Sequence, residues 1–221
     1  AGRRAPPGRR ALMPRVTGGS VAAHRADTTA RIFASLRDLL YERGYDALSL
    51  ADVAEHAGMA RTAMYNYFSD KEALLGAYTA QETDVFLAQL DEALRNVDNP
   101  VDQLRVFVRL QVEYFQDSHL PPGPTLRLLL PEPAATEVIG HIALLEARLH
   151  QILRVGRDRR YFLVDDVDAS TAMITACVSR GSVADPERTT EEAVAATEAF
   201  VLRALGAKFA ADGRPRRLPR R

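Results

Sequence analysis

Between residues 49 and 71 the chain gathers side chains that can bind phosphate groups and the edges of DNA bases. Arg61 can donate two hydrogen bonds to O6 and N7 of one guanine, which contributes roughly 1–3 kcal/mol of discrimination between bases. Thr62 can touch a thymine methyl group or a phosphate. Ser49 can cap a helix whose free N–H groups and dipole attract phosphate. The chemistry that these residue types support is recognition of double-stranded DNA.

The spacing of three smaller residues indicates how those side chains are held. Ala54 is small enough to let two helices approach, Gly58 follows four residues later, and the apolar Met64 comes six residues after that. A tight turn between helices needs the backbone freedom of glycine, and an apolar residue must fill the gap between the helices. This spacing is typical of a helix-turn-helix, which projects the start of its second helix toward a DNA major groove.

Apolar residues recur at helical spacing along most of the chain, which predicts an all-α protein of about nine helices. The first helix is expected to begin near Asp27-Thr28 and to end at Gly44. The second should begin behind Ser49, with Asp52 placed for a capping box. The third should cover about 60–67, and residues 69–72 should cap a fourth that continues to about Arg95. We expect five more helices at about 101–118, 125–130, 134–155 and 164–183, and after an Asp185-Pro186 cap.

The last helix is expected to carry one apolar stripe. That stripe consists of Val194, Thr197, Phe200, Val201, Ala204 and Leu205. The helix before it is rich in small residues, which let a partner helix approach closely. No run convincingly predicts a β-strand, and the only strand-like run is 161–164.

Composition narrows the classes of protein that this chain can be. Its 221 residues, 47% of them hydrophobic, are enough for one or two domains with a substantial core. The single cysteine, Cys177, excludes an internal disulfide and a cysteine metal cluster. No secretory signal and no apolar run of membrane-spanning length are present, so we expect a cytoplasmic protein.

The net charge is zero, but the charges are unevenly distributed. Residues 1–71 hold 11 Lys/Arg and 7 Asp/Glu, residues 72–207 hold 12 and 21, and residues 208–221 hold 6 and 1. We therefore expect a disordered basic arm at 1–26, a basic helix-turn-helix domain at 27–72, an acidic helical body at 73–207 and a disordered basic tail at 208–221. The arm could add phosphate contacts of its own.

Three short helices followed by a larger helical body resemble the tetracycline-repressor (TetR) family of bacterial transcription regulators. The resemblance is closest over residues 28–76. The matching residues are Ile32, Glu42-Arg43-Gly44-Tyr45, Ser49, Ala51, Val53, Ala54, Gly58-Met59, Tyr65, Tyr67, Phe68 and Lys71-Glu72-Ala73-Leu74. One residue departs from the pattern, because Ala60 stands where the family usually has a hydroxyl residue that caps the recognition helix. A lost cap typically costs about 1 kcal/mol.

The resemblance assigns further roles. Tyr65 and Tyr67 match an aromatic pair that grips phosphates, and Lys71 matches a phosphate-binding lysine. Asn66 is expected to face outward beside them. The residues expected to contact DNA are therefore Ser49, Arg61, Thr62, Tyr65, Asn66, Tyr67 and Lys71.

The family resemblance also implies how the body works. One recognition helix reads few base pairs, so a homodimer through the last two helices is expected to bind a palindromic operator. A small, mostly apolar effector is expected to bind among the fourth to seventh helices and to release the DNA. The candidate pocket residues are Phe86, Phe107, Leu110, Tyr114, Arg127, His141 and Leu145. For the apolar members of this set, ordinary core packing is the alternative.

Two other classes of function compete with this interpretation. A helical DNA-binding regulator could lack a small effector and be gated by a protein partner. A helical enzyme is the remote alternative, but none of the five histidines pairs with another at metal-binding spacing and no glycine-rich phosphate loop exists. We therefore expect no catalytic activity, no metal and no cofactor.

Overall fold

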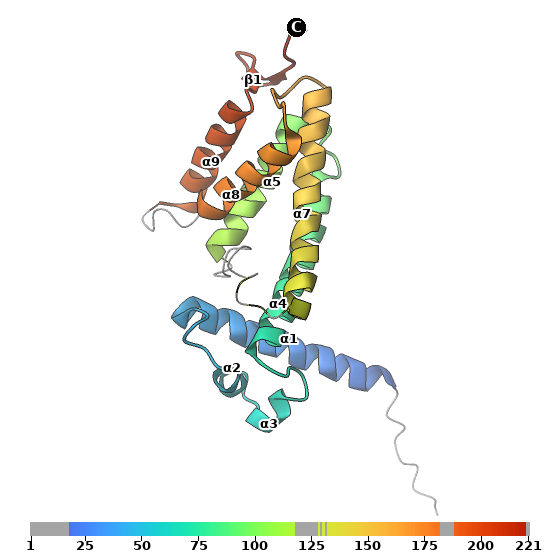
Figure 1. The fold of residues 1–221 in the computed structure, drawn as a ribbon, viewed down its shortest axis with the longest axis vertical. Helices are drawn as coiled ribbons and strands as arrows, with labels where there is room; N and C mark the ends of the chain where they lie inside the picture. The colour runs from blue at the N-terminus through green and yellow to red at the C-terminus, as the bar shows by residue number, and fades with distance from the viewer. Residues whose placement is uncertain (1–17, 118–127, 129, 131, 182–187, 220–221) are drawn as a thin grey trace, which may run out of the picture.

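The computed structural model describes residues 18–117, 128, 130, 132–181 and 188–219. The described part confirms the all-α prediction: a small N-terminal head lies across one end of a larger helical body (Figure 1). Its helices are α1 (Gly18–Arg43), α2 (Leu50–His56), α3 (Arg61–Met64), α4 (Lys71–Leu94), α5 (Pro100–Asp117), α7 (Glu132–Asp158), α8 (Val167–Gly181) and α9 (Thr190–Ala204).

The head is held together by a core of its own. The apolar stripe of α1 is buried, with Ile32 and Leu36 at 0% exposure, because residues at this spacing share one helix face. Against it pack Leu50, Val53 and Ala54 of α2 and the start of α4. These contacts join α1, α2 and the start of α4 into one unit.

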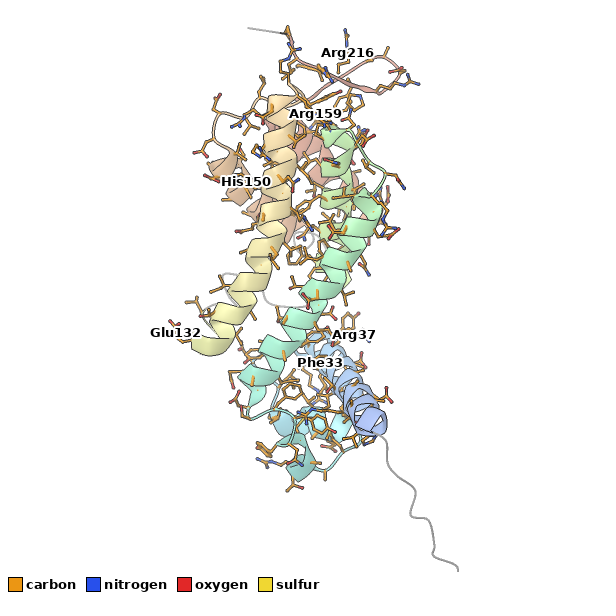
Figure 2. The ribbon with its side chains drawn as sticks, turned by 90° about the vertical axis from the view of Figure 1, so that its right-hand side faces the viewer. Phe33, Arg37, Glu132, His150, Arg159 and Arg216 are labelled. Atoms are coloured by element: carbon orange, nitrogen blue, oxygen red, sulfur yellow. The ribbon has the colours of Figure 1, made fainter. Side chains whose placement is uncertain are left out.

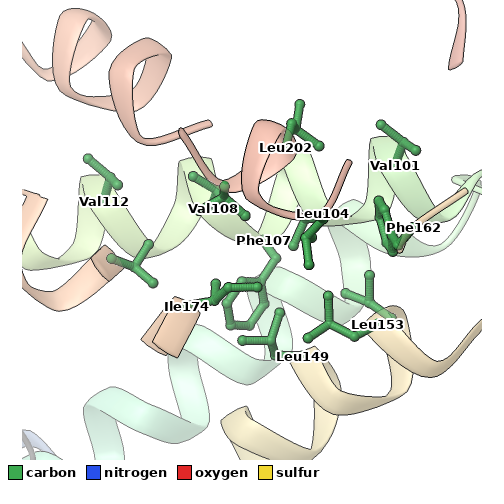
Figure 3. Packing of buried hydrophobic residues seen from close by; sticks show 14 of the residues in the cluster. Val101, Leu104, Phe107, Val108, Val112, Leu149, Leu153, Phe162, Ile174 and Leu202 are labelled. Carbon is green, nitrogen blue, oxygen red and sulfur yellow. The ribbon is translucent and has the colours of Figure 1, made fainter. Parts of the chain in front are cut away.

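A second core lies between α5, α7, α8, α9 and the far half of α4. Figure 3 shows Phe107 of α5 among Leu104, Leu149 and Ile174, which come from three different helices. α5 supplies Val101, Leu104, Phe107, Val108 and Val112 to this core, and their spacing places them along one face of the helix.

Two helices connect the cores. α4 contributes Leu74 and Tyr78 to the head core, and Phe86 and Leu90 to the body core. α7 does the same, because Ala135 and Val138 belong to the head cluster while its later turns belong to the body cluster. Figure 2 shows α7 beginning at Glu132 near the head and passing His150 toward the far end of the molecule.

The start of the first helix differs from the prediction. α1 begins at Gly18, not near Asp27, so the last nine residues of the expected disordered arm are helical. Thr28, expected as an N-cap, instead lies inside the helix, where its hydroxyl donates to the carbonyl of His24 at 2.8 Å. The reason is helix propensity, because 20–26 contains three alanines and neither proline nor glycine. The rest of the arm, 1–17, lies outside the described residues.

The expected disordered tail is also corrected. β1 (Lys208–Phe209) and β2 (Pro215–Arg216) form an antiparallel hairpin around an Asp212-Gly213 turn, a dipeptide that favours hairpins. Gly213 has a φ of +79°, and Leu218 beyond it is buried. The N–H of Leu218 donates to the carbonyl of Arg160 at 2.6 Å, which ties the tail to the loop after α7. Figure 2 places Arg216 at the end of the molecule opposite the head.

The last two helices begin later than predicted. α8 starts at Val167 rather than Val164, and the Asp166 carboxylate accepts from the N–H of Ala169 at 2.9 Å. α9 starts behind Thr189, whose hydroxyl and the Glu192 carboxylate form a capping box. The predicted cap at 185–186 and most of the predicted helix at 125–130 lie outside the described residues. Phe200, part of the predicted apolar stripe of the last helix, is 58% exposed.

Among the described helices, none has both the length and the apolar character needed to cross a membrane.

Candidate nucleic-acid interface

The turn between α2 and α3 has the geometry that its sequence predicts. Gly58 adopts a φ of +65°, a conformation that costs little only for glycine. The N–H of Met59 then donates to the carbonyl of Ala54 at 3.0 Å, and the side chain of Met64 is fully buried between the helices. These contacts fix the direction of α3 relative to α2.

The outer face of α3 and the residues after it carry the predicted base readers. Arg61, Thr62, Tyr65 and Asn66 are exposed, with Tyr65 at 50%. α3 itself is shorter than predicted and ends at Met64, after which the N–H groups of Tyr67 and Phe68 both donate to the Met64 carbonyl. Ala60 makes no side-chain cap, as expected. Four polar side chains therefore face solvent on one short element.

Ser49 is confirmed as the N-cap of α2. Its hydroxyl accepts from the N–H of Asp52 at 3.2 Å and donates to the Asp52 carboxylate, which also accepts from the N–H of Ser49. These hydrogen bonds lower the pKa of the Asp52 carboxyl, because they stabilise its charged form. The capping box thus occupies the Ser49 hydroxyl that was expected to meet a phosphate.

Lys71 begins α4 and is anchored to the end of the first helix. Its ammonium lies 3.2 Å from the carbonyl of Tyr45, to which it donates, and 4.1 Å from the centre of the Tyr45 ring. The Tyr45 hydroxyl in turn donates to the Glu72 carboxylate at 3.2 Å, and burial together with Glu72 raises the pKa of Tyr45. An ammonium has three donors, so this bond leaves two for a phosphate.

Tyr67 is half-buried and packs against the head core, unlike its exposed neighbour Tyr65. A cation lies on its ring: the guanidinium carbon of Arg25 is 5.1 Å from the ring centre. Arg25 is absent from the predicted set of DNA contacts. A signal for it existed, because Arg25 is three residues before the buried Thr28 and seven before Ile32, and so shares their face of the helix.

The predicted pocket residues lie partly together in the body. Phe86 and Phe107 are buried in its core, with Leu110, Tyr114 and Leu145 packed against them. The rings of Phe86 and Tyr114 meet edge to face at 5.5 Å. Arg127 lies outside the described residues, as does the side chain of His141.

A hollow of about 300 Å³ lies elsewhere, between α7 and α8. Its lining includes His150, whose Nε2 is 3.1 Å from an Asp168 carboxylate oxygen, but none of the predicted pocket residues. The five described pocket residues therefore pack as core in this structure.

The outer faces of α8 and α9 carry exposed apolar side chains. Met173 of α8 is 67% exposed and Phe200 of α9 is 58% exposed. Ala172, Ala176 and Ala196 are exposed on the same two helices. Single exposed apolar residues are common, but two large ones among alanines on neighbouring helices resemble an uncovered packing face.

The head therefore defines a helix-turn-helix protein whose second helix presents an arginine and a threonine to solvent, with an exposed tyrosine directly after it. Residues 32–78 match the model of the bacterial regulatory proteins of the tetR family. The regulator RutR of Escherichia coli K12 is 33% identical over 103 residues, which are 47% of this chain and 48% of RutR. The chain thus matches about half the length of such curated relatives.

Solved structures match over a longer stretch. The TetR family regulator PfmR of Thermus thermophilus is 26% identical, with a TM-score of 0.67 over 78% of this chain and 97% of PfmR. FadR of Bacillus subtilis, solved in complex with stearoyl-CoA, is 19% identical and shares the fold, with a TM-score of 0.65 over 80% of this chain and 96% of FadR. Residues 32–78 therefore match the tetR family of bacterial regulatory proteins, and the chain shares the fold of solved regulators of that family.

Proposed function

We propose that the protein is a transcriptional repressor that binds a palindromic operator as a homodimer and releases it when a small, mostly apolar molecule binds the body. The observation that carries the DNA-binding part is the exposed face of α3, held rigidly by Met64 at 0% exposure. Rigid presentation favours sequence reading, because side chains that are already placed lose less entropy when they meet the bases.

Dimerisation is supported by the exposed faces of α8 and α9. Met173 and Phe200 would be covered if the two helices packed against their copies in a second chain. Two heads would then contact half-sites about 34–36 Å apart, or a multiple of this. A twofold axis in the protein predicts the palindrome in the operator.

Coupling between effector and DNA is supported by the two helices that join the cores. Tyr114 packs against both the head cluster and the body cluster, and α4 and α7 contribute side chains to each. A molecule that displaced Tyr114 or the neighbouring Phe86 would shift α4, and α4 carries the head. A ligand can release DNA in this way only if it binds the shifted state more tightly.

A second candidate is a DNA-binding regulator with no small effector, gated by a protein partner. The close packing of Phe86, Phe107 and Tyr114 favours it, because an apolar effector needs room among them. Thermal denaturation with a library of small apolar molecules separates the two. An effector should raise the melting temperature and release bound DNA, whereas a protein-gated regulator should respond to none.

The test of the DNA-binding proposal is selection of binding sites from random duplexes, for the wild type and for Arg61→Ala. We expect a palindromic consensus for the wild type and a relaxed preference at one position of each half-site for the variant. Arg95→Ala removes an arginine paired with Glu92 at the far end of α4, and serves as the control. A variant consensus identical to the wild type would refute base reading by Arg61.

A further inference from the structure

We propose that Arg25 is a DNA-phosphate contact, fixed by the ring of Tyr67 beside the recognition helix. The inference rests on the proposed function, because it extends the DNA interface of the same head. It assigns a role to the N-terminal turns of α1, which continue nine residues beyond the start predicted from the sequence.

The position of Arg25 follows from the geometry of α1. Thr28 and Ile32 are buried, at 5% and 0% exposure, and lie three and seven residues after Arg25. Residues at these spacings share one face of a helix, so Arg25 continues the buried face of α1. At the edge of the head core, Arg25 on this face lies over the ring of Tyr67, with its guanidinium carbon 5.1 Å from the ring centre.

The ring of Tyr67 is a fixed support. Tyr67 is half-buried against the head core, and its N–H donates to the carbonyl of Met64, the last residue of α3. The ring that supports the guanidinium therefore keeps a fixed position relative to the recognition helix. A phosphate contact at Arg25 would fix the position of that helix on the duplex without reading a base.

The chemistry of the pair suits a phosphate. A guanidinium group stays charged at any physiological pH and carries five N–H donors in one plane. A contact with the face of an aromatic ring consumes none of these donors, so they remain for oxygen atoms. Arg25 is exposed, and no carboxylate among the described residues forms an ion pair with it. Its charge is therefore available to an anion.

Arg31 provides a matched control. It is also exposed on α1, six residues further along, so its side chain projects about 120° away from that of Arg25 around the helix axis. Arg25→Gln and Arg31→Gln remove the same charge from the same helix. Only the first removes a cation from the ring of Tyr67.

The experiment measures the affinity of the full chain for a random-sequence duplex and for a duplex chosen by site selection, over a series of salt concentrations. For Arg25→Gln we expect the negative slope of log affinity against log salt to become shallower by about 0.9 for each protomer bound. Both duplexes should lose affinity by the same factor, so the preference between them stays unchanged. Arg31→Gln and Arg25→Lys should keep the slope of the wild type.

The other outcomes are equally distinct. If Arg25→Gln lowers the melting temperature but keeps the wild-type salt slope, Arg25 only supports Tyr67 and the proposal is wrong. If Arg25→Gln and Arg31→Gln change the slope equally, the effect is one of overall charge, and the proposal is again wrong. Both results leave the proposed function intact. A wild-type protein that binds neither duplex would overturn the proposed function and this inference together.

Discussion

The ring of Phe162 occupies the space that a side chain at position 156 would need. A Cβ atom on Gly156, which is buried in the last turns of α7, would lie 2.1 Å from Cδ2 and 2.3 Å from Cε2 of that ring. The ring belongs to the loop after α7, and the backbone N–H of Phe162 donates to the Gly156 carbonyl at 3.3 Å. Gly156 therefore allows the loop to fold back onto the helix.

Replacing Gly156 by alanine should destabilise the protein. The added methyl group must push the Phe162 ring out of the body core, and overpacking of this kind typically costs about 1–3 kcal/mol. Chemical denaturation of Gly156→Ala and Gly140→Ala measures this. Gly140 lies in the same helix, is exposed and would have no atom within 4 Å of an added Cβ, so alanine there should stabilise by roughly 0.5–1 kcal/mol. Equal effects of the two variants would contradict the packing argument.

Lys71→Ala should weaken DNA binding about equally for every sequence and flatten its dependence on salt. The reason is that Lys71 is expected to meet a phosphate, which carries no sequence information. The variant also loses the contact with the Tyr45 ring, worth about 0.5–2 kcal/mol of stability. Lys71→Arg, which keeps the charge, is the matched comparison. A salt slope for Lys71→Ala that equals the wild-type slope would leave Lys71 with a structural role only.

Glu82→Gln should stabilise the protein at neutral pH but not in acid. Burial raises the pKa of the Glu82 carboxyl above 4.5, and Arg37 only partly opposes this. The folded state therefore binds the Glu82 proton more tightly than the unfolded state, so the contribution of Glu82 to stability is greatest below pH 4.5 and falls as pH rises through the folded-state pKa. Glutamine mimics the protonated form, and its advantage should vanish as the pH drops below 4.5.

Thermal melts of wild type and Glu82→Gln over a pH series check this expectation. Glu146→Gln removes a carboxylate from an exposed position on α7 and controls for the change in net charge. A stabilisation by Glu82→Gln that stays constant at every pH would show that burial of the charge is not its cause.

The sequence alone determined the head to a large extent, because its signals are local. The Ser49 and Asp52 pair caps α2, Asp70 caps α4, and the two glycines at 44 and 58 take the left-handed conformation expected of them. Each of these interactions joins residues within three or four positions of each other. Residue type and spacing therefore suffice to predict them, and the exposed face of α3 follows from the same turn.

Two features that differ from the predictions also have local signals. Thr189 and Glu192 have the spacing of a capping box, and Asp212-Gly213 is a strong hairpin dipeptide. The expectation of a loose, basic tail rested on its arginines and prolines, and it overlooked the apolar Phe209 and Leu218. Phe209 lies under the guanidinium of Arg105, 4.9 Å from the ring centre, and Leu218 is buried.

Only the tertiary structure decided which apolar face of α9 is covered and which aromatic rings Lys71 and Arg25 contact. Phe200 and Val201 are neighbours of similar character, yet only Val201 meets the body core. The placement of Lys71 on Tyr45, and of Arg25 on Tyr67, joins residues 26 and 42 positions apart. Helical periodicity fixes the direction of a side chain around its own axis, but what that side chain meets depends on how the helices pack against each other.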